Sequence, residues 1–144
     1  MAPGMTGPLY TTEILRLAAS LSEPRELGRE DGRAELRSPT CGSRISVAVQ
    51  LDGSGRIECL SQRVHACAFG QASAALLERS ALASDHAQVA QALVALSAWL
   101  AGEREDAGEW PGLLALEPAR SRRSRHGAIL LPFRALLAAI EARR

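Results

Sequence analysis

Two cysteines carry most of the chemistry that this sequence offers. Cys41 stands in the segment Pro39-Thr40-Cys41-Gly42-Ser43 ahead of an expected strand, and Cys67 follows the partner strand. Pairing across the expected hairpin brings Cys41 opposite position 66, next to Cys67. Two thiolates at one end of a sheet form half of a site for a soft metal: zinc, iron or an iron–sulfur cluster. A closed tetrahedral site needs two further ligands, and the alternative is a pair of partly buried thiols that hold no metal.

Cys67 lies where a segment with β-like alternation gives way to small residues that suit a tightly packed helix. The free N–H groups and the dipole of a first helical turn favour a thiolate at such a junction. Cys59 shares an expected strand face with Ile57, so it is predicted to be an ordinary core or sheet residue. His65 shares the face of Cys67 if the strand continues that far, which leaves a ligand role open for its imidazole.

Composition limits the classes of function. The 144 residues suffice for one hydrophobic core, and with 3% aromatic residues that core must consist mainly of Leu, Ala, Val and Ile. So few aromatic side chains, with a formal net charge of +1, argue against nucleic acid as a partner. No apolar run is long enough for a membrane span, and no signal-peptide pattern is present. Three cysteines cannot make a complete disulfide framework, so we expect a reducing compartment, the cytoplasm.

The periodicity of apolar residues predicts helices and strands in a definite order. We expect a helix at 9–21 capped by Thr11 or Thr12, strands at 34–38, 44–51 and 56–64, and helices at 72–83 and 86–100. A short helical turn is expected within 110–116, and a last helix from about Gly127 or Ile129 to Arg143. This order predicts an α+β fold: an N-terminal helix, a small antiparallel sheet of two to three strands, and three to four helices packed on one side. Residues 1–8 are expected to form a flexible leader, and 9–144 a single domain.

Individual positions within these elements carry further predictions. Ile45, Val47, Val49 and Leu51 should share one buried strand face. Ala75, Leu76 and Leu82 are candidates for the buried side of the helix at 72–83. Pro132 is expected in the first turn of the last helix, where its missing N–H costs little. Trp99 and Trp110 are expected to be core or loop anchors.

Five motifs occur in a fixed order along nearly the whole chain, from Leu9 to about Ala142. They are Tyr10 with its helix, Pro24-Arg25-x-x-Gly28, Pro39-x-Cys41-Gly42, Cys67-x-x-x-x-Ala72-Ser73, and Ile129-Leu130-Leu131-Pro132-Phe133-Arg134-Ala135-Leu136. In order and spacing the sequence resembles the IscU/NifU-like (SufU-like) iron–sulfur cluster assembly scaffolds. The resemblance implies an IscU/SufE-like fold with three cysteines and an aspartate at one tip. Such a site accepts iron and sulfide, holds a nascent cluster or a zinc ion, and passes the cluster to apo-proteins.

The resemblance also assigns site positions in this chain. Cys41 and Cys67 match the first two cysteines, Ser43 replaces the aspartate, and the third cysteine position falls at Ala128. His126, close to that position, could supply an imidazole to zinc or iron, or could be an exposed histidine at a helix start. Ser43 could orient a water molecule or cap a backbone group, but its protonated hydroxyl is a poor direct ligand.

An arginine-rich segment precedes the last helix. It contains Arg120, Arg122, Arg123 and Arg125. These side chains could dock an acidic partner or bind an anion, or they could form a solvated loop. Just before them, Leu116-Glu117-Pro118-Ala119-Arg120 faintly resembles the chaperone-recognition loop of the scaffold family. The resemblance further implies a cysteine desulfurase and apo-protein acceptors as partners.

Three hypotheses follow for function. The first is a cytoplasmic scaffold, not an enzyme, that holds a transient cluster (2Fe–2S) or zinc through Cys41 and Cys67. A homodimer that shares one cluster would supply two cysteines from each copy. The second is an adaptor that keeps the fold, has lost the site, and binds an assembly partner. The third is a zinc-dependent sulfur acceptor.

Overall fold

The computed structural model describes residues 10–39 and 42–143; the expected leader and Cys41 lie outside this part of the chain. An N-terminal helix is followed by three strands and then by helices, which confirms the predicted α+β class. The elements are α2 (Thr12–Ala19), β1 (Gly32–Arg37), β2 (Arg44–Leu51), β3 (Ile57–His65), α3 (Ala68–Ala81), α4 (His86–Leu100), η1 (Leu113–Ala119), η2 (Arg123–Arg125) and α5 (His126–Glu141).

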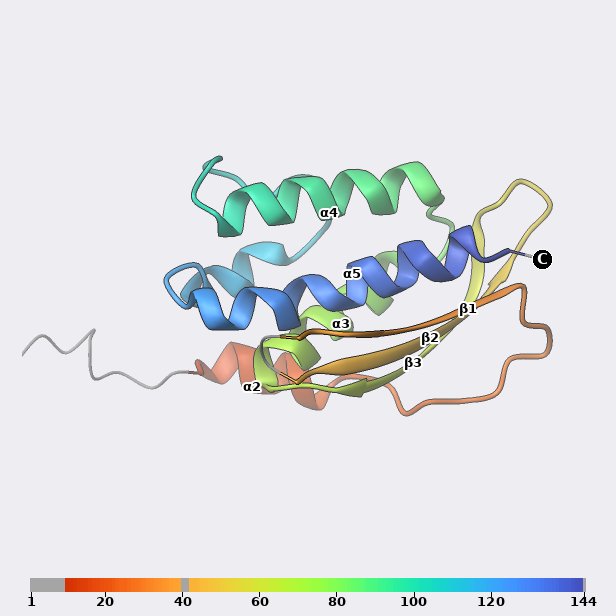
Figure 1. Ribbon diagram of the computed structural model, residues 1–144, viewed down its shortest axis with the longest axis horizontal. Helices are drawn as coiled ribbons and strands as arrows, with labels where there is room; N and C mark the ends of the chain where they lie inside the picture. The colour runs from red at the N-terminus through yellow and green to blue at the C-terminus, as the bar shows by residue number, and fades with distance from the viewer. Residues whose placement is uncertain (1–9, 40–41, 144) are drawn as a thin grey trace, which may run out of the picture.

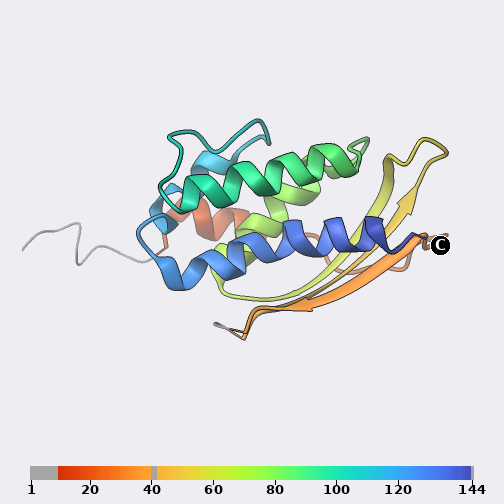
Figure 2. The ribbon, with the colours of Figure 1, turned by 45° about the horizontal axis from the view of Figure 1, so that its top comes forward.

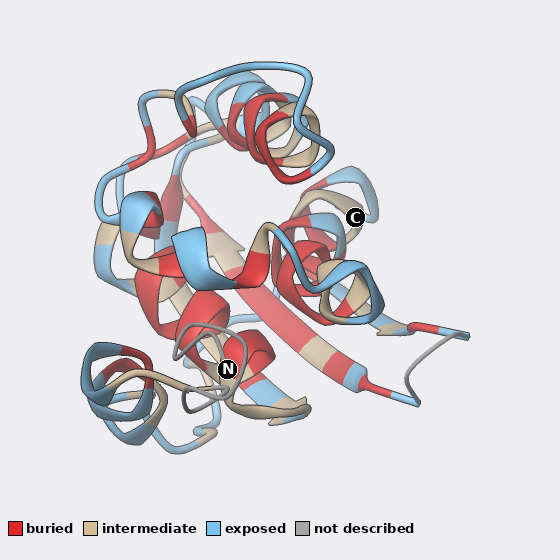
Figure 3. Ribbon diagram, turned by 90° about the vertical axis from the view of Figure 1, so that its left-hand side faces the viewer, coloured by how far each residue is buried: buried red, intermediate tan, exposed pale blue. Residues whose placement is uncertain are grey.

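The three strands form one antiparallel sheet in the order β1-β2-β3, with the helices on one of its faces (Figures 1 and 2). α5 packs on β1 and β2, α3 packs on β3, and α4 packs on α5 as the outermost layer. The predicted inner face of β2 is confirmed, because Ile45, Val47, Val49 and Leu51 are all buried. Figure 3, an end view coloured by burial, shows that the buried sides of the helices face one another and the sheet.

No helix in the described part of the chain is long and apolar enough to cross a membrane.

A bulge near the start of β3 corrects the predicted strand faces. Gln50 pairs with Cys59 and Leu51 pairs with Ile57, so Glu58 is the extra residue of the bulge. Ile57 therefore lies in the core while Cys59 lies on the outer face, and the prediction that they share a face is wrong. The hairpin register is also displaced by two residues, because Arg44 pairs with His65 instead of Arg63. The bulge and a turn in which the Asp52 N–H donates to the Arg56 carbonyl account for this shift.

The helix starts follow their local capping signals. Thr11 Oγ1 accepts a hydrogen bond from the Ile14 N–H at 3.1 Å, as expected for a cap of α2. Asp85 caps α4 in a reciprocal capping box with Gln88. The start of α3 was predicted too late, because the helix begins at Ala68 and includes Gly70 despite the poor helix propensity of glycine.

Two predictions for the helices are wrong. Leu82 lies just beyond the end of α3 in extended conformation and is 59% exposed, whereas a buried position was expected. Pro132 lies in the second turn of α5, because this helix already begins at His126. The proline has no N–H for the carbonyl of Ala128. Burial of α5 along most of its length offsets this loss, and the Ser73 hydroxyl donates to the neighbouring Ile129 carbonyl at 2.6 Å.

Both tryptophans are anchors, as predicted. Trp99 is 1% exposed within α4. The Trp110 indole N–H donates to the Leu76 carbonyl at 3.1 Å, and its ring meets Phe133 edge to face with 5.5 Å between the centroids. These contacts fix the long 102–112 loop to α3 and α5.

Replacing Asp31 with asparagine is expected to reduce the acid sensitivity of folding. The carboxylate accepts hydrogen bonds from Arg29 Nε at 3.1 Å and from the Leu51 N–H at 2.7 Å. The bond from Arg29 is the larger cause and the bond from Leu51 the next, and both hold the pKa of Asp31 below its ordinary value. A depressed pKa stabilises the fold above the unfolded-state value and loses this effect as the pH falls through the folded-state value. Urea midpoints at about pH 7 and about pH 3 should show a larger stability advantage of the wild type over Asp31→Asn at the higher pH.

Glu103→Gln is the control for Asp31→Asn, because Glu103 is exposed and takes part in none of the ion pairs formed by residues 10–39 and 42–143. Equal gaps between wild type and Asp31→Asn at both pH values would contradict the linkage.

Candidate metal and sulfur site

Cys67 occupies the N-cap position of α3, two residues after the last residue of β3. Its backbone is extended, its carbonyl accepts from the Gln71 N–H at 3.0 Å, and its half-buried side chain makes no capping hydrogen bond. The first-turn N–H groups of α3 therefore face the end of the molecule where Cys67 lies. The predicted junction between a strand and a helix is confirmed.

Ala128 packs against the same helical turn. Gly70 lies between Ala66 and Ala128, since a Cβ on Gly70 would stand 2.6 Å from the Ala66 Cβ and 3.3 Å from the Ala128 Cβ. Ala128 is 1% exposed, in the first turn of α5. The fold thus brings the predicted third-cysteine position within one turn of Cys67, although a methyl group there offers no donor atom. Sequence reasoning missed Ala66 and Gly70, whose small size permits this approach.

The two candidate histidines differ in their surroundings. His126 Nε2 lies 2.9 Å from the Ala119 carbonyl oxygen and 3.2 Å from that of Arg120. Because carbonyls only accept, Nε2 carries a proton, and only Nδ1 of this ring could bind a metal. His65 is exposed and ends β3, so the strand does not continue to Cys67 and the two side chains do not share a strand face.

Ser43 lies at the same end of the sheet. It precedes Arg44, the residue that pairs with His65, and it is 5% exposed. Its carbonyl accepts from the Ser38 N–H at 2.8 Å, and the Gly42 N–H donates to the Ser38 carbonyl at 3.1 Å. These bonds fix the described flanks of the connection between β1 and β2. Cys41 itself lies outside the described residues, so its approach to Cys67 stays a prediction.

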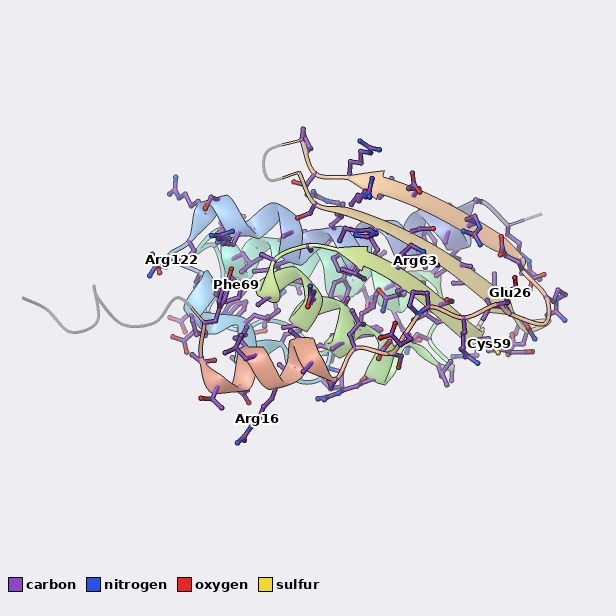
Figure 4. The ribbon with its side chains drawn as sticks, turned by 90° about the horizontal axis from the view of Figure 1, so that it is seen from below. Arg16, Glu26, Cys59, Arg63, Phe69 and Arg122 are labelled. Carbon is purple, nitrogen blue, oxygen red and sulfur yellow. The ribbon has the colours of Figure 1, made fainter. Side chains whose placement is uncertain are left out.

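Within residues 10–39 and 42–143, no three His, Cys, Asp or Glu side chains gather to hold a metal ion. Cys59 and Cys67 are both free thiols, but Cys59 pairs with Gln50 near the opposite end of β3. The rise of a strand puts it about 20 Å from the end that leads to Cys67. Figure 4 shows the labelled Phe69, two residues after Cys67, toward one end of the molecule and Cys59 toward the other. Cys59 is a sheet residue, as predicted, and no part of this site.

The arginine-rich segment divides into an anchored residue and exposed ones. The Arg120 guanidinium lies over the Trp99 ring, 5.0 Å from its centroid, and Nε donates to the Trp99 carbonyl at 3.0 Å. Arg120 thereby connects the end of η1 to α4. Arg122 and Arg123 are exposed and Arg125 is half-buried, so these three remain available for the predicted docking role.

Comparisons with known proteins identify the fold through solved structures. No protein-family model matches the chain, and no curated protein matches it either. The N-terminal part of a NifU-like protein from Brucella abortus has a TM-score of 0.86 at 27% identity, covering 93% of this chain and 93% of that chain. A protein from Fervidobacterium islandicum AW-1, described as an iron–sulfur cluster assembly scaffold for the SUF system, has a TM-score of 0.82 at 17% identity, covering 92% and 96%.

The chain therefore has the fold of the NifU- and SufU-type iron–sulfur cluster assembly scaffolds, with an N-terminal helix, a three-stranded antiparallel sheet and helices on one face. The resemblance to IscU/NifU-like scaffolds that the motifs indicate is thereby confirmed at the level of the fold.

Proposed function

We propose that this chain is a scaffold-like protein that binds iron, a nascent cluster or zinc through Cys41 and Cys67 and hands cluster or sulfur to partners. One observation carries the proposal: Cys67 lies at the N-cap of α3, one turn before the Gly70 that packs against Ala128, on a fold that matches a NifU-like protein over 93% of the chain. The protein acts as a scaffold and not as an enzyme, in the cytoplasm, where reducing conditions keep both thiols available.

The donor set favours a cluster shared between two copies. Ser43 and Ala128 offer no thiolate or carboxylate, so one copy contributes two cysteines at most. A 2Fe–2S cluster takes four protein ligands, and a tetrahedral zinc ion also takes four. Two cysteines from each of two copies would supply them. The Nδ1 atom of His126 is the alternative source of a third donor. The proposal therefore includes a homodimer that forms only with metal.

Anaerobic reconstitution with iron and sulfide tests this proposal. The wild type should gain a sulfide-to-iron chromophore and a dimer mass on size-exclusion chromatography. Cys41→Ala and Cys67→Ala should lose both, because a single thiolate per copy cannot complete the ligand set. Cys59→Ala is the matched control and should behave as the wild type, since Cys59 lies on the outer face of β3 far from this end.

Elemental analysis of the same freshly purified proteins separates zinc from iron and tests the zinc-dependent sulfur acceptor. Absence of chromophore and metal from the wild type, or equal metal content in all four proteins, would contradict the proposal.

A second candidate function is an adaptor without a cluster. Ser43 and Ala128, which have lost ligand chemistry, and the exposed Arg122 and Arg123 favour it. Such an adaptor would bind a cysteine desulfurase or an assembly factor through the arginine-rich segment and the Cys67 end. Desulfurase binding by a Cys41→Ala/Cys67→Ala variant as tight as that of the wild type, with no metal in either, would favour the adaptor over the scaffold.

A further inference from the structure

The outer face of the sheet, which no helix of residues 10–39 and 42–143 covers, has a row of basic residues at one end. Arg37 on β1 stands directly opposite Arg44 on β2, and Arg44 stands directly opposite His65 on β3. All three residues are exposed. Like charges directly opposite one another destabilise a sheet. The arginine pair in this row therefore costs stability unless something outside the chain neutralises it.

A hollow of about 410 Å³ adjoins this row. It lies between the segment 24–27 and the outer face of the strands, and its charged lining residues are Arg25, Arg33 and Arg63 together with Glu26 and Glu30. The Arg25 N–H donates to Ser61 Oγ at 2.9 Å, which fixes the segment to the face. Arg63, labelled in Figure 4, stands two residues before His65 on the same strand, so the hollow and the row form one continuous surface.

Most guanidinium groups of this surface have no anionic partner in the described part of the chain. Arg33 is neutralised by Glu30, with Nε 2.8 Å from the carboxylate. Arg25, Arg37, Arg44 and Arg63, in contrast, take part in none of the ion pairs among residues 10–39 and 42–143. Guanidinium groups pair with carboxylates or phosphates through two parallel hydrogen bonds.

The distribution of charge on this surface favours carboxylates on a protein over the phosphates of a nucleic acid. Glu35 stands opposite Ser46, inside the arginine cluster, where it would repel a continuous polyanion. No Phe, Tyr or Trp occupies an outward position of the three strands, so bases would find no stacking platform. An acidic protein segment can space its carboxylates on either side of Glu35.

We propose that an acidic segment of a partner protein docks on this outer face, with its carboxylates on Arg37, Arg44 and Arg63. This proposal goes beyond the scaffold function and needs no metal. The row ends at His65, two residues before Cys67. A partner docked here would therefore reach the end of the molecule that carries the thiol.

Fluorescence anisotropy with a labelled peptide of alternating glutamate and serine tests the surface on the full chain. Arg37→Glu/Arg44→Glu/Arg63→Glu should weaken binding at least about tenfold, since several modest ion pairs are lost together. Added salt should weaken the wild-type complex as well. The matched control, Arg16→Glu/Arg79→Glu/Arg134→Glu, makes the same charge change at exposed helix positions and should bind within about twofold of the wild type.

Equal weakening in both triple variants would overturn the proposal, because the peptide would then respond to net charge alone. Tighter binding of a single-stranded DNA oligonucleotide than of the peptide, lost in the same sheet variant, would also overturn it in favour of nucleic acid. If circular dichroism shows that the glutamate variant does not fold, Arg37→Gln/Arg44→Gln/Arg63→Gln decides by the same criteria.

Discussion

Replacing Gly32 with alanine is expected to lower the free energy of unfolding by about 3 kcal/mol. Gly32 begins β1, pairs with Val49 and lies against α5. A Cβ at this position would overlap the backbone carbonyl oxygen of Ala139. Because Ala139 is fully buried in α5, its carbonyl cannot turn away as a flexible side chain would, and the strand or the helix must shift.

Urea denaturation of the two proteins measures this effect directly. Gly28→Ala is the matched control, because nothing lies within 4 Å of a Cβ at Gly28. It should change the free energy of unfolding by no more than about 0.5 kcal/mol. If Gly32→Ala proved as stable as Gly28→Ala, the close contact between β1 and α5 would be wrong.

Elements with strong local signals could be predicted from the sequence almost to the residue. β2 alternates cleanly between apolar and polar residues, and α4 begins at an Asp85 cap with Gln88 in the capping box. The bulge opposite Gln50 and Leu51 has no such signal, because it depends on how two strands pair and not on either strand alone. The wrong faces of Ile57 and Cys59 follow from this non-local cause.

The candidate site shows the same difference between features set by local sequence and features set by the folded chain. The position of Cys67 could be predicted, since the change from alternation to small residues is local. The hydrogen bonds of His126 to the carbonyls of Ala119 and Arg120, and the stacking of Arg120 on Trp99, could not. They depend on segments that meet only in the folded chain. The nearness of Ala128 to the Cys67 turn was expected only from the family resemblance, and contacts with Gly70 now support it.

Gln62 is a polar residue at a buried strand position, which the alternation of apolar and polar residues does not predict. It stands on the inner face of β3, opposite Val47, where an apolar residue would be expected. Its side chain is 4% exposed; Nε2 donates to the Ala74 carbonyl at 3.0 Å, while Oε1 has no partner in the described residues. The single hydrogen bond joins β3 to the middle of α3 and offsets only part of the cost of burying the amide.

Replacing Phe69 with alanine is expected to lower the free energy of unfolding by about 4 kcal/mol. Phe69 is fully buried in the first turn of α3, two residues after Cys67. Its ring meets Tyr10 edge to face, with 5.0 Å between the centroids and 64° between the planes. Truncation leaves a cavity and removes this aromatic pair, so the start of α3 loses its attachment to the chain just before α2.

The same truncation should expose the thiol of Cys67. In a Cys41→Ser background, a thiol-specific reagent should modify Cys67 faster in Phe69→Ala than in the parent, because the first turn of α3 opens more often. Phe69→Leu keeps most of the volume and should cost only about 1 kcal/mol, with little change in this rate. Cys59, at the other end of β3, serves as the internal control, and its rate should change less than that of Cys67. Equal acceleration at both cysteines would mean that Phe69 supports the whole fold and not the Cys67 turn in particular.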